Sequence, residues 1–505
     1  MSNRRTFLRQ SLAVGALAAL PGGLACSSLD PRRPNFLVFL ADDLGYGDLG
    51  SYGNPIIQTP YLDAFAEQGI RFTDFHSGGT VCSPSRASLL TGRNPYRSGF
   101  YYIAGSGMHL QQNDVTIATL LRDSGYDTCF VGKWHLSRFD RDVAVAPTPG
   151  DHGFDYWFAT AVNAFEGPEN PNTFYRNGQR VGEMSGWYCD IIVEEALAWM
   201  SRRPNPEKPF FLEVCSHEPH TPVAPPEEYA AMYDGPAADS LERQIAYGQV
   251  DRPPGIGGNK RYYYGTVSQL DHAFGQLIGG LDESGLAEDT LTIFTSDNGP
   301  EAPVNFEESR GEWEDASRDR SFGTPGDWRG MKRYPYEGGH RVPGIVRWPG
   351  RVAPGQVSDE LINGTDFLPT LAELAGVALP DRTLDGISFA PVLRGEKLQR
   401  TRPVFWFFPA HEDTYYRMPH AAMRDGAWTL MGWLPTKAKD TLIMDWLKDE
   451  QLERFTLYNL DSDPEQRTDL LATKPERAEQ MIGQMKAFWS EIQADSPYWE
   501  SWQMK

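Results

Sequence analysis

Acidic and amide side chains follow two apolar runs of the sequence. Asp42-Asp43 comes just after residues 35–40, and Asp297-Asn298-Gly299 follows residues 291–295. Converging oxygen ligands without thiolate or multiple-histidine spacing suit a hard divalent cation, Ca²⁺ or Mg²⁺, better than Zn²⁺. The alternative is that each pair is only a cap or a turn, which is the commoner role of such residues. Both pairs fall at predicted strand ends, where a shared metal site would lie.

A cysteine and an arginine share one short segment. Residues 81–93 are typical of a loop that carries Cys82, followed by a helix that Pro84 opens and Gly92 closes. A cysteine at a helix N-terminus beside Arg86 is expected to have a lowered pKa, because both the helix dipole and the guanidinium favour the thiolate. The residues alone therefore predict a nucleophile or one member of an anion site.

Strands that alternate with helices must position these side chains. Apolar runs predict strands at residues 35–40, 126–131, 209–215 and 291–295, and helical patterns lie at 59–69, 191–200 and 265–281. Thr59 is expected to be the N-cap of the helix at 59–69. This alternation predicts an α/β fold with a large parallel or mixed sheet between helices, and ligands of such sheets bind beyond the carboxyl ends of the strands.

The pattern of predicted elements changes near residues 385–400. Short strands are predicted at 404–408, 421–424, 428–431 and 456–460, and a terminal helix at 474–492. We therefore expect a catalytic domain over residues 31–385 and a smaller C-terminal α+β domain with an antiparallel sheet over residues 386–505.

The N-terminus is typical of an export signal over residues 1–30. Arg4-Arg5 precedes a short apolar run and small residues that end at Cys26; the run is too short to span ~30 Å of hydrocarbon. The arginine pair followed by Phe-Leu resembles the twin-arginine type, and an ordinary secretory signal is the alternative. Cys26 resembles a lipoprotein attachment site, although Gly23 stands where a branched apolar residue is usual. We expect a bacterial protein of the periplasm or cell surface, tethered to a membrane only through a lipid on Cys26.

The net charge and the number of cysteines limit the kinds of partner and scaffold that fit this chain. The 505 residues carry a formal charge of −21 without a basic block, so nucleic acid is excluded as a partner. Five scattered cysteines are too few for a disulfide scaffold.

The segment from Cys82 to Arg93, Cys-Ser-Pro-Ser-Arg followed by Leu-Leu-Thr-Gly-Arg, resembles the signature of type I sulfatases in the alkaline phosphatase superfamily. In that family a maturase oxidises the cysteine to formylglycine. Further segments resemble family motifs in the family's order: 41–48, 132–136, 296–299, 337–343 and 457–465. The resemblance covers nearly the whole mature chain.

The resemblance implies a role for each matching residue. One calcium ion is expected to bind Asp42, Asp43, Asp297, Asn298 and the modified Cys82. Arg86 is expected to hold the formylglycine hydrate, and the sulfate and leaving oxygen are expected to lie among Lys133, His135, His220 and Lys332. His220 is favoured over His217, since the family's histidine precedes an x-Pro. Where related arylsulfatases often place a serine against sulfate this chain has Asn163, so that role is not carried over.

Two further side chains have a structural expectation beside a functional one. Arg341 is expected to brace the turn at Glu337-Gly338-Gly339. Trp406 could stack on a sugar, but a buried aromatic is the commoner explanation.

The implied reaction is hydrolysis of a sulfate ester of a carbohydrate or an aryl group. One hydroxyl of the hydrated aldehyde attacks sulfur, a histidine or lysine protonates the leaving oxygen, and the second hydroxyl is deprotonated to expel sulfate. A serine has no second hydroxyl. A phosphodiesterase or phosphonate monoester hydrolase of the same superfamily is the alternative within hydrolases, and a catalytically inactive glycan-binding relative is the alternative outside them.

Overall fold

A strand with every side chain buried, β1 (Asn35–Ala41), lies at the centre of the fold. The computed structural model describes residues 33–105, 107–141, 146–164, 166–234, 260–301, 322–409 and 419–502. The predicted export signal at residues 1–30 lies outside these ranges, as does Cys26.

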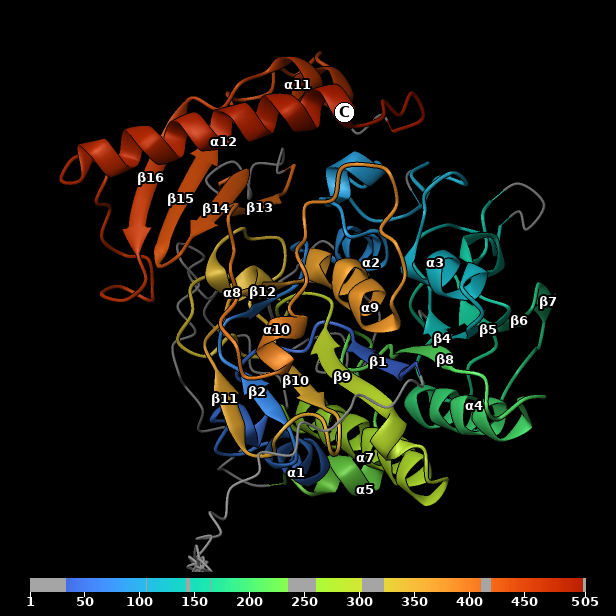
Figure 1. Ribbon diagram of the computed structural model, residues 1–505. Coiled ribbons are helices and arrows are strands. Elements are labelled where there is room, and N and C mark those ends of the chain that lie inside the picture. Colours follow the sequence, from blue (N-terminus) through green and yellow to red (C-terminus); the bar gives the residue numbers. More distant parts are fainter. Residues whose placement is uncertain are drawn as a thin grey trace, which may run out of the picture. The chain divides into compact units, whose positions relative to one another are not determined.

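Within the described residues, ten strands form one mixed sheet around β1 (Figure 1). Their order is β11 (Gln356–Ser358), β2 (Ile70–Phe72), β10 (Gly344–Arg347), β9 (Thr290–Ser296), β1, β8 (Phe210–Cys215), β4 (Asp127–Lys133), β5 (Tyr156–Thr160), β6 (Tyr175–Arg176) and β7 (Gln179–Arg180). The strands from β9 to β5 run parallel, and β10 is antiparallel to β9.

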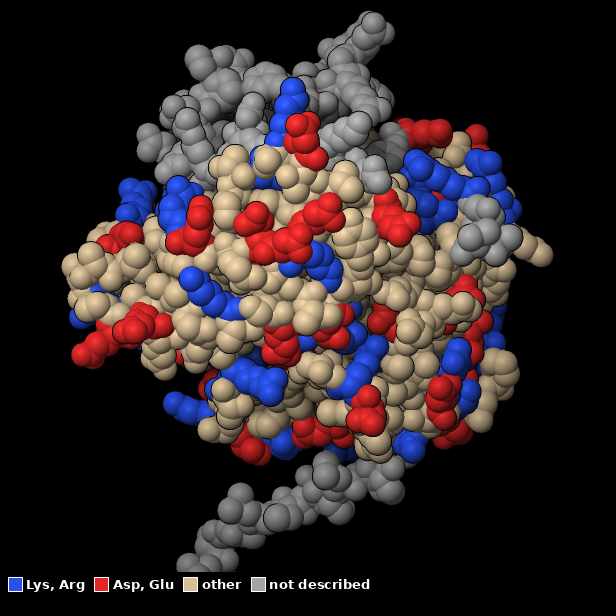
Figure 2. Space-filling view, turned by 90° about the horizontal axis from the view of Figure 1, so that it is seen from above, with Lys and Arg blue, Asp and Glu red and all other residues tan. Residues whose placement is uncertain are grey.

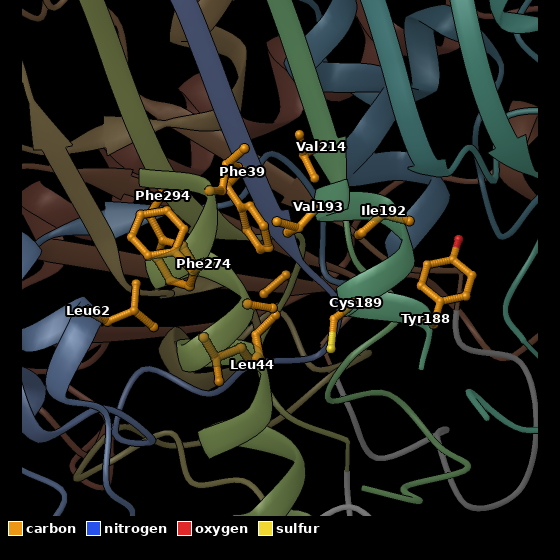
Figure 3. Close-up of a cluster of buried hydrophobic side chains, with 14 of the residues drawn as sticks. Phe39, Leu44, Leu62, Tyr188, Cys189, Ile192, Val193, Val214, Phe274 and Phe294 are labelled. Carbon is orange, nitrogen blue, oxygen red and sulfur yellow. The ribbon is translucent and has the colours of Figure 1, made fainter. Parts of the chain in front are cut away.

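Helices cover both faces of this sheet. Leu37 and Phe39 of β1 pack on one face, against α1 (Pro60–Glu67), α4 (Tyr188–Arg202), α5 (Glu227–Ala231) and α7 (Arg261–Glu283) (Figure 3). Phe36 and Val38 pack on the other face, against α2 (Cys82–Thr91), α3 (Ile117–Asp123), α9 (Phe367–Ala375) and α10 (Ala390–Leu393). Alternate side chains of a strand point to opposite faces, so a continuous apolar run is what a sheet covered on both sides requires. The predicted α/β class is confirmed.

A second sheet lies toward the C-terminus. It contains, in order, β13 (Val404–Phe407), β14 (Ala421–Asp425), β15 (Trp428–Trp433) and β16 (Arg454–Asn459), all antiparallel. Helix α12 (Pro475–Asp495) lies along this sheet (Figure 1). Its Met481, Met485 and Trp489 belong to the core between them. Helix α11 (Ile443–Asp449) joins the same core. The predicted small antiparallel sheet is thus confirmed, and the boundary at residue 385 stays a prediction.

None of the helices in the described ranges has the length and apolarity that crossing a membrane requires.

The first turn of α1 is capped by a residue far away in the sequence. Thr59 makes no capping hydrogen bond with its side chain, contrary to what its position suggests. Instead, the Asp271 carboxylate of α7 accepts hydrogen bonds from the backbone N–H groups of Tyr61 (3.2 Å) and Leu62 (2.7 Å). A carboxylate there satisfies donors that the helix leaves free.

Asp271 predicts a pH dependence of stability. Burial raises its pKa to about 7, against roughly 3.9 in an unfolded chain. The folded state therefore holds an extra proton between these values, and the stabilisation present below the lower value is lost as the pH rises to 7. We expect Asp271→Asn, which cannot ionise, to gain about 2 to 3 kcal/mol relative to wild type between pH 5 and pH 7.5 in urea unfolding. A stability difference that stays constant with pH would contradict this explanation.

Candidate active site

The predicted acidic and amide residues meet at one edge of the large sheet. β1 and β9 pair in parallel with Ala41 opposite Ser296, so the residues after each strand leave the sheet side by side. The backbone N–H of Asp297 donates to the carbonyl of Ala41 (3.0 Å), and that of Asp43 donates to Asp297 Oδ1 (3.2 Å). Parallel pairing thus brings together residues that lie about 250 positions apart.

Within the described structure, the side-chain nitrogen of Asn298 is hydrogen-bonded and its side-chain oxygen is not. Its Nδ2 donates to Asp43 Oδ1 (2.7 Å) and to the carbonyl of Gly299 (2.8 Å). Its Oδ1 is buried and has no hydrogen-bond partner among the described atoms. A buried oxygen without a donor is unfavourable unless a cation or water satisfies it.

Cys82 is the first residue of α2, and its Sγ lies 3.5 Å from Asp42 Oδ1. The expectation of a lowered thiol pKa is wrong. Burial raises the pKa of Cys82, and the Asp42 carboxylate raises it further, against the opposing effect of Lys133. The local sequence shows the helix N-terminus and Arg86, but not that the thiol is buried beside a carboxylate.

Three cationic side chains balance the three carboxylates. Arg86 donates to Asp297 Oδ2 from Nε (2.9 Å) and Nη2 (2.8 Å), and to the carbonyl of Lys133 from Nη1 (2.6 Å). Lys133 Nζ donates to Asp42 Oδ2, and Lys332 Nζ donates to Asp43 Oδ2 (2.7 Å). All six side chains are buried. Their mutual attraction in a low dielectric offsets the cost of removing them from water.

The carboxylates differ in proton affinity. Burial alone would raise the pKa of Asp42, but Lys133, His220, Arg86 and Lys332 together outweigh it and hold that pKa well below the ordinary value. Burial and the adjacent Asp42 raise the pKa of Asp297, with Arg86 opposing them. Two neighbouring carboxyl groups with pKa values pushed apart are typical of sites that move protons.

The backbone of the Lys133 segment demands a glycine. Gly132 has a φ of 106°, and a Cβ there would lie 1.9 Å from the carbonyl oxygen of Cys215. Only glycine allows β4 and β8 to approach so closely while Lys133 ends the strand.

The histidines lie around the same cluster. His220 Nε2 is 3.6 Å from Asp43 Oδ2, and its side chain keeps 16% exposure. His135 is buried, and the pKa of its ring lies well below the ordinary value because of burial, Lys133 and Arg86. His217 is also buried and accepts from the backbone N–H of Ala164 (3.4 Å). Of the two alternatives, His220 is therefore the one that contacts an aspartate of the cluster.

Two residues of the cluster were not assigned from the sequence. Asn163 Nδ2 donates to Asp42 Oδ2 (3.0 Å), and Glu301 Oε2 lies 3.5 Å from Lys332 Nζ. An amide at residue 163 can donate a hydrogen bond by its type, and here it donates to a carboxylate, whereas nothing in the sequence signals that Glu301 reaches Lys332.

The arrangement can hold a divalent cation. Ligand atoms of Asp42, Asp43, Cys82 and His220 lie within 4.8 Å of one another, and Asp297 and Asn298 border them. Carboxylate and amide oxygens suit Ca²⁺ or Mg²⁺. The unpartnered Asn298 Oδ1 supplies a further ligand, so the residues present fit such an ion.

Comparison with known proteins decides the family. A model of the sulfatase family matches residues 34–377, which is well over half of the chain. The chain belongs to the type I sulfatase family. A model described as the C-terminal part of N-sulphoglucosamine sulphohydrolase matches residues 326–495 of this sulfatase.

Individual relatives agree. Human arylsulfatase A is 36% identical over 79% of this chain and 74% of its own length. N-acetylgalactosamine-6-sulfatase of Canis lupus familiaris is 32% identical over 75% and 69%. The crystal structure of the PsFucS1 sulfatase from Pseudoalteromonas sp. matches with a TM-score of 0.69 and 26% identity over 93% and 92% of the two chains. The protein is therefore a sulfatase, an enzyme that hydrolyses sulfate esters.

A more distant structure has a bound ligand. BT4656, in complex with its substrate D-glucosamine-2-N,6-O-disulfate, matches with a TM-score of 0.66 and 21% identity over 92% of this chain and 98% of that chain. At this identity the match shows that the fold is shared.

The raised thiol pKa predicts an inert cysteine. In protein produced without a maturase, we expect Cys82 to resist iodoacetamide at pH 8, because the thiol is buried and stays protonated. In urea the same cysteine should be alkylated readily. Peptide mass spectrometry measures both states, and rapid alkylation of Cys82 in the folded protein would contradict the structure.

Proposed function

We propose that this sulfatase releases inorganic sulfate from a sulfated carbohydrate or an aryl sulfate, with residue 82 matured to formylglycine beside one calcium ion. The observation that supports this most is the position of Cys82 Sγ, 3.5 Å from Asp42 Oδ1 inside the cluster of aspartates. An unmodified thiol there is a poor nucleophile because its pKa is raised by burial. The reaction therefore needs a different group at that position.

Asp42, Asp43, Asp297, Asn298 and residue 82 would hold the calcium ion. When bound, the ion would supply positive charge that stabilises a deprotonated hydroxyl and the oxygens of the sulfate group. The hydrated aldehyde would supply two hydroxyl groups, one to attack and one to collapse.

The remaining side chains bind and orient the ester. In the proposal the ammonium groups of Lys133 and Lys332, which pair with Asp42 and Asp43 here, would bind the sulfate oxygens when Asp42 and Asp43 hold the ion. Arg86 stays on Asp297 and braces residue 82 from the same helix. His220, the most exposed of these groups, donates a proton to the leaving oxygen, and His135 donates a hydrogen bond.

Local charge outweighs the charge of the whole protein. The chain carries a formal net charge of −21 and should repel an anionic glycan at long range. Figure 2 shows acidic and basic side chains interspersed on the face in view, without a basic stripe. Salt screens exposed charges beyond about 8 Å but screens buried charges much less. The buried Lys133 and Lys332 are therefore the groups that can bind sulfate, while Arg86 adds positive charge beside residue 82.

The names of the relatives support the substrate class. One acts as an arylsulfatase and another as an N-acetylgalactosamine-6-sulfatase. The N-terminal signal supports export to the bacterial periplasm or cell surface, with Cys26 as a lipid site. Together they favour a role in degrading sulfated polysaccharide outside the cytoplasm.

Position 82 carries the first test of this proposal. Co-expression with a formylglycine-generating maturase should give protein that releases sulfate, with the aldehyde detected at residue 82 by peptide mass spectrometry. Cys82→Ser should lose activity by several orders of magnitude, since its single hydroxyl would trap the sulfated enzyme after one turnover. Steady turnover by Cys82→Ser would contradict the mechanism.

The second test concerns the transferred group. We expect sulfate release from p-nitrophenyl sulfate or from one member of a panel of defined sulfated mono- and disaccharides. Its kcat/KM should be at least about a hundredfold above that for phosphate monoesters, phosphate diesters and phosphonates. This ratio corresponds to about 2.7 kcal/mol in transition-state binding. Ion chromatography of released sulfate and phosphate measures both. A preference for phosphodiesters or phosphonates would favour the alternative hydrolase.

A further inference from the structure

A second buried cluster of titratable side chains lies outside the active site. His76 ends β3 (Phe75–His76), and His340 ends the short helix α8 (Glu337–His340). Both rings are fully buried, and their Nδ1 atoms lie 2.9 Å apart. Asp74, Glu337, Arg341 and Arg424 surround the two rings.

The two carboxylates of this cluster are ionised. Arg424 donates to Glu337 Oε1 (2.8 Å) and to Asp74 Oδ2 (3.0 Å), and Arg341 pairs with the other oxygen of each acid. Burial acts to raise the pKa of both acids, but the two arginines outweigh it: the pKa of Asp74 lies well below the ordinary value and that of Glu337 is about 2. Asp74 can therefore only accept a hydrogen bond.

The contacts of the rings require three protons. His76 Nε2 lies 2.7 Å from Asp74 Oδ1, and His340 Nε2 lies 3.2 Å from the carbonyl oxygen of Pro335. Both oxygens are acceptors, so both Nε2 atoms must carry hydrogen. The Nδ1–Nδ1 contact needs one more proton between the rings. Two neutral imidazoles supply only two N–H groups, whereas an imidazole and an imidazolium supply three.

We infer that His76 and His340 form an imidazole–imidazolium pair that shares one proton between their Nδ1 atoms and acts as a positioning element for the active site. The positive charge faces Asp74 and Glu337, and the Trp406 ring stacks on His340 at 3.9 Å and 8°, a geometry that favours a cation. Trp406 is thus a buried aromatic of this cluster. Arg341 and Arg424 occupy the carboxylate oxygens that a metal ion would otherwise use.

The pair connects three segments that the active site depends on. The backbone N–H of Ser77 donates to the carbonyl of His340 (2.8 Å), and that of Gly299 donates to the carbonyl of Gly339 (3.0 Å). Ser77 belongs to the segment that leads to Cys82, and Gly299 follows Asp297-Asn298. Trp406 Nε1 of the second sheet donates to the carbonyl of Ser77 (2.7 Å). The positioning role rests on the proposed function, whereas the shared proton does not.

The shared proton is sensitive to pH. Burial is the largest influence and lowers the pKa of both rings, that of His340 well below the ordinary value; Asp74 raises the pKa of His76 and Glu337 raises that of His340, against Arg341 and Arg424. The hydrogen bonds of the pair therefore hold the shared proton at acidic pH. Loss of the proton at higher pH leaves one of the three contacts without hydrogen, with two lone pairs facing each other. The pair should then separate and release the segments that it joins.

Nitrogen-15 NMR of the histidine-labelled full-length protein tests the proton directly. We expect three of the four ring nitrogens of His76 and His340 to be protonated at pH 5, with signals assigned by single substitution. Two protonated nitrogens would overturn the inference. So would one equivalent of zinc that wild type retains and His76→Phe loses. Neither result depends on sulfate release, so each is distinct from a failure of the proposed function.

Matched variants test the positioning role. His340→Gln can donate one amide hydrogen to His76 Nδ1 and the other to the carbonyl of Pro335, so a neutral His76 that donates to Asp74 completes the network; His76→Phe can make neither of its contacts. We expect His76→Phe to lower kcat about tenfold with KM unchanged. His340→Gln should keep kcat near that of wild type and remove the fall in activity that wild type shows as the pair titrates. His272→Gln, on α7, is the control and should keep the wild-type profile. An unchanged pH profile in His340→Gln would overturn the role.

Discussion

Burying three carboxylates at one edge of a sheet is the constraint on which the rest of this sulfatase depends. Asp42, Asp43 and Asp297 are all removed from water, and an ionised carboxylate without partners costs several kcal/mol in such a place. Three basic side chains compensate them in the structure, each at hydrogen-bond distance. If Lys133 and Lys332 are to turn to a sulfate group, as proposed, another cation must replace them on Asp42 and Asp43. The proposed divalent ion would restore this balance of charge.

The fold supplies the convergence that the charges require. Parallel pairing of β1 with β9, and of β4 with β8, brings the ends of separate strands to one edge. Apolar cores pack on both faces of the sheet, and the N-terminus of the buried helix α2 presents Cys82 to the aspartates. Burial at this edge sets the chemistry as well, because it raises the thiol pKa and lowers the pKa of His135. A site built from strand ends is therefore dry, charged and well ordered.

Much of this arrangement could be predicted from the sequence. Continuous apolar runs identify the buried strands, because a sheet covered on both faces needs them, and acids just after two runs point to a shared site. Contacts between distant residues could not be predicted. The cap of α1 by Asp271 and the pairing of His76 with His340 depend on side chains about 210 and 264 positions apart. The predicted lowering of the Cys82 pKa was wrong for the same reason, since the local sequence shows Arg86 but not the burial of the thiol beside Asp42.

Isothermal titration of calcium into metal-stripped protein tests the central claim most directly. The account predicts one ion per chain for the wild type and loss of binding in Asp297→Asn, with Asp271→Asn, outside the site, as the control that still binds. Absence of calcium and magnesium binding by folded wild-type protein, or undiminished binding by Asp297→Asn, would contradict it.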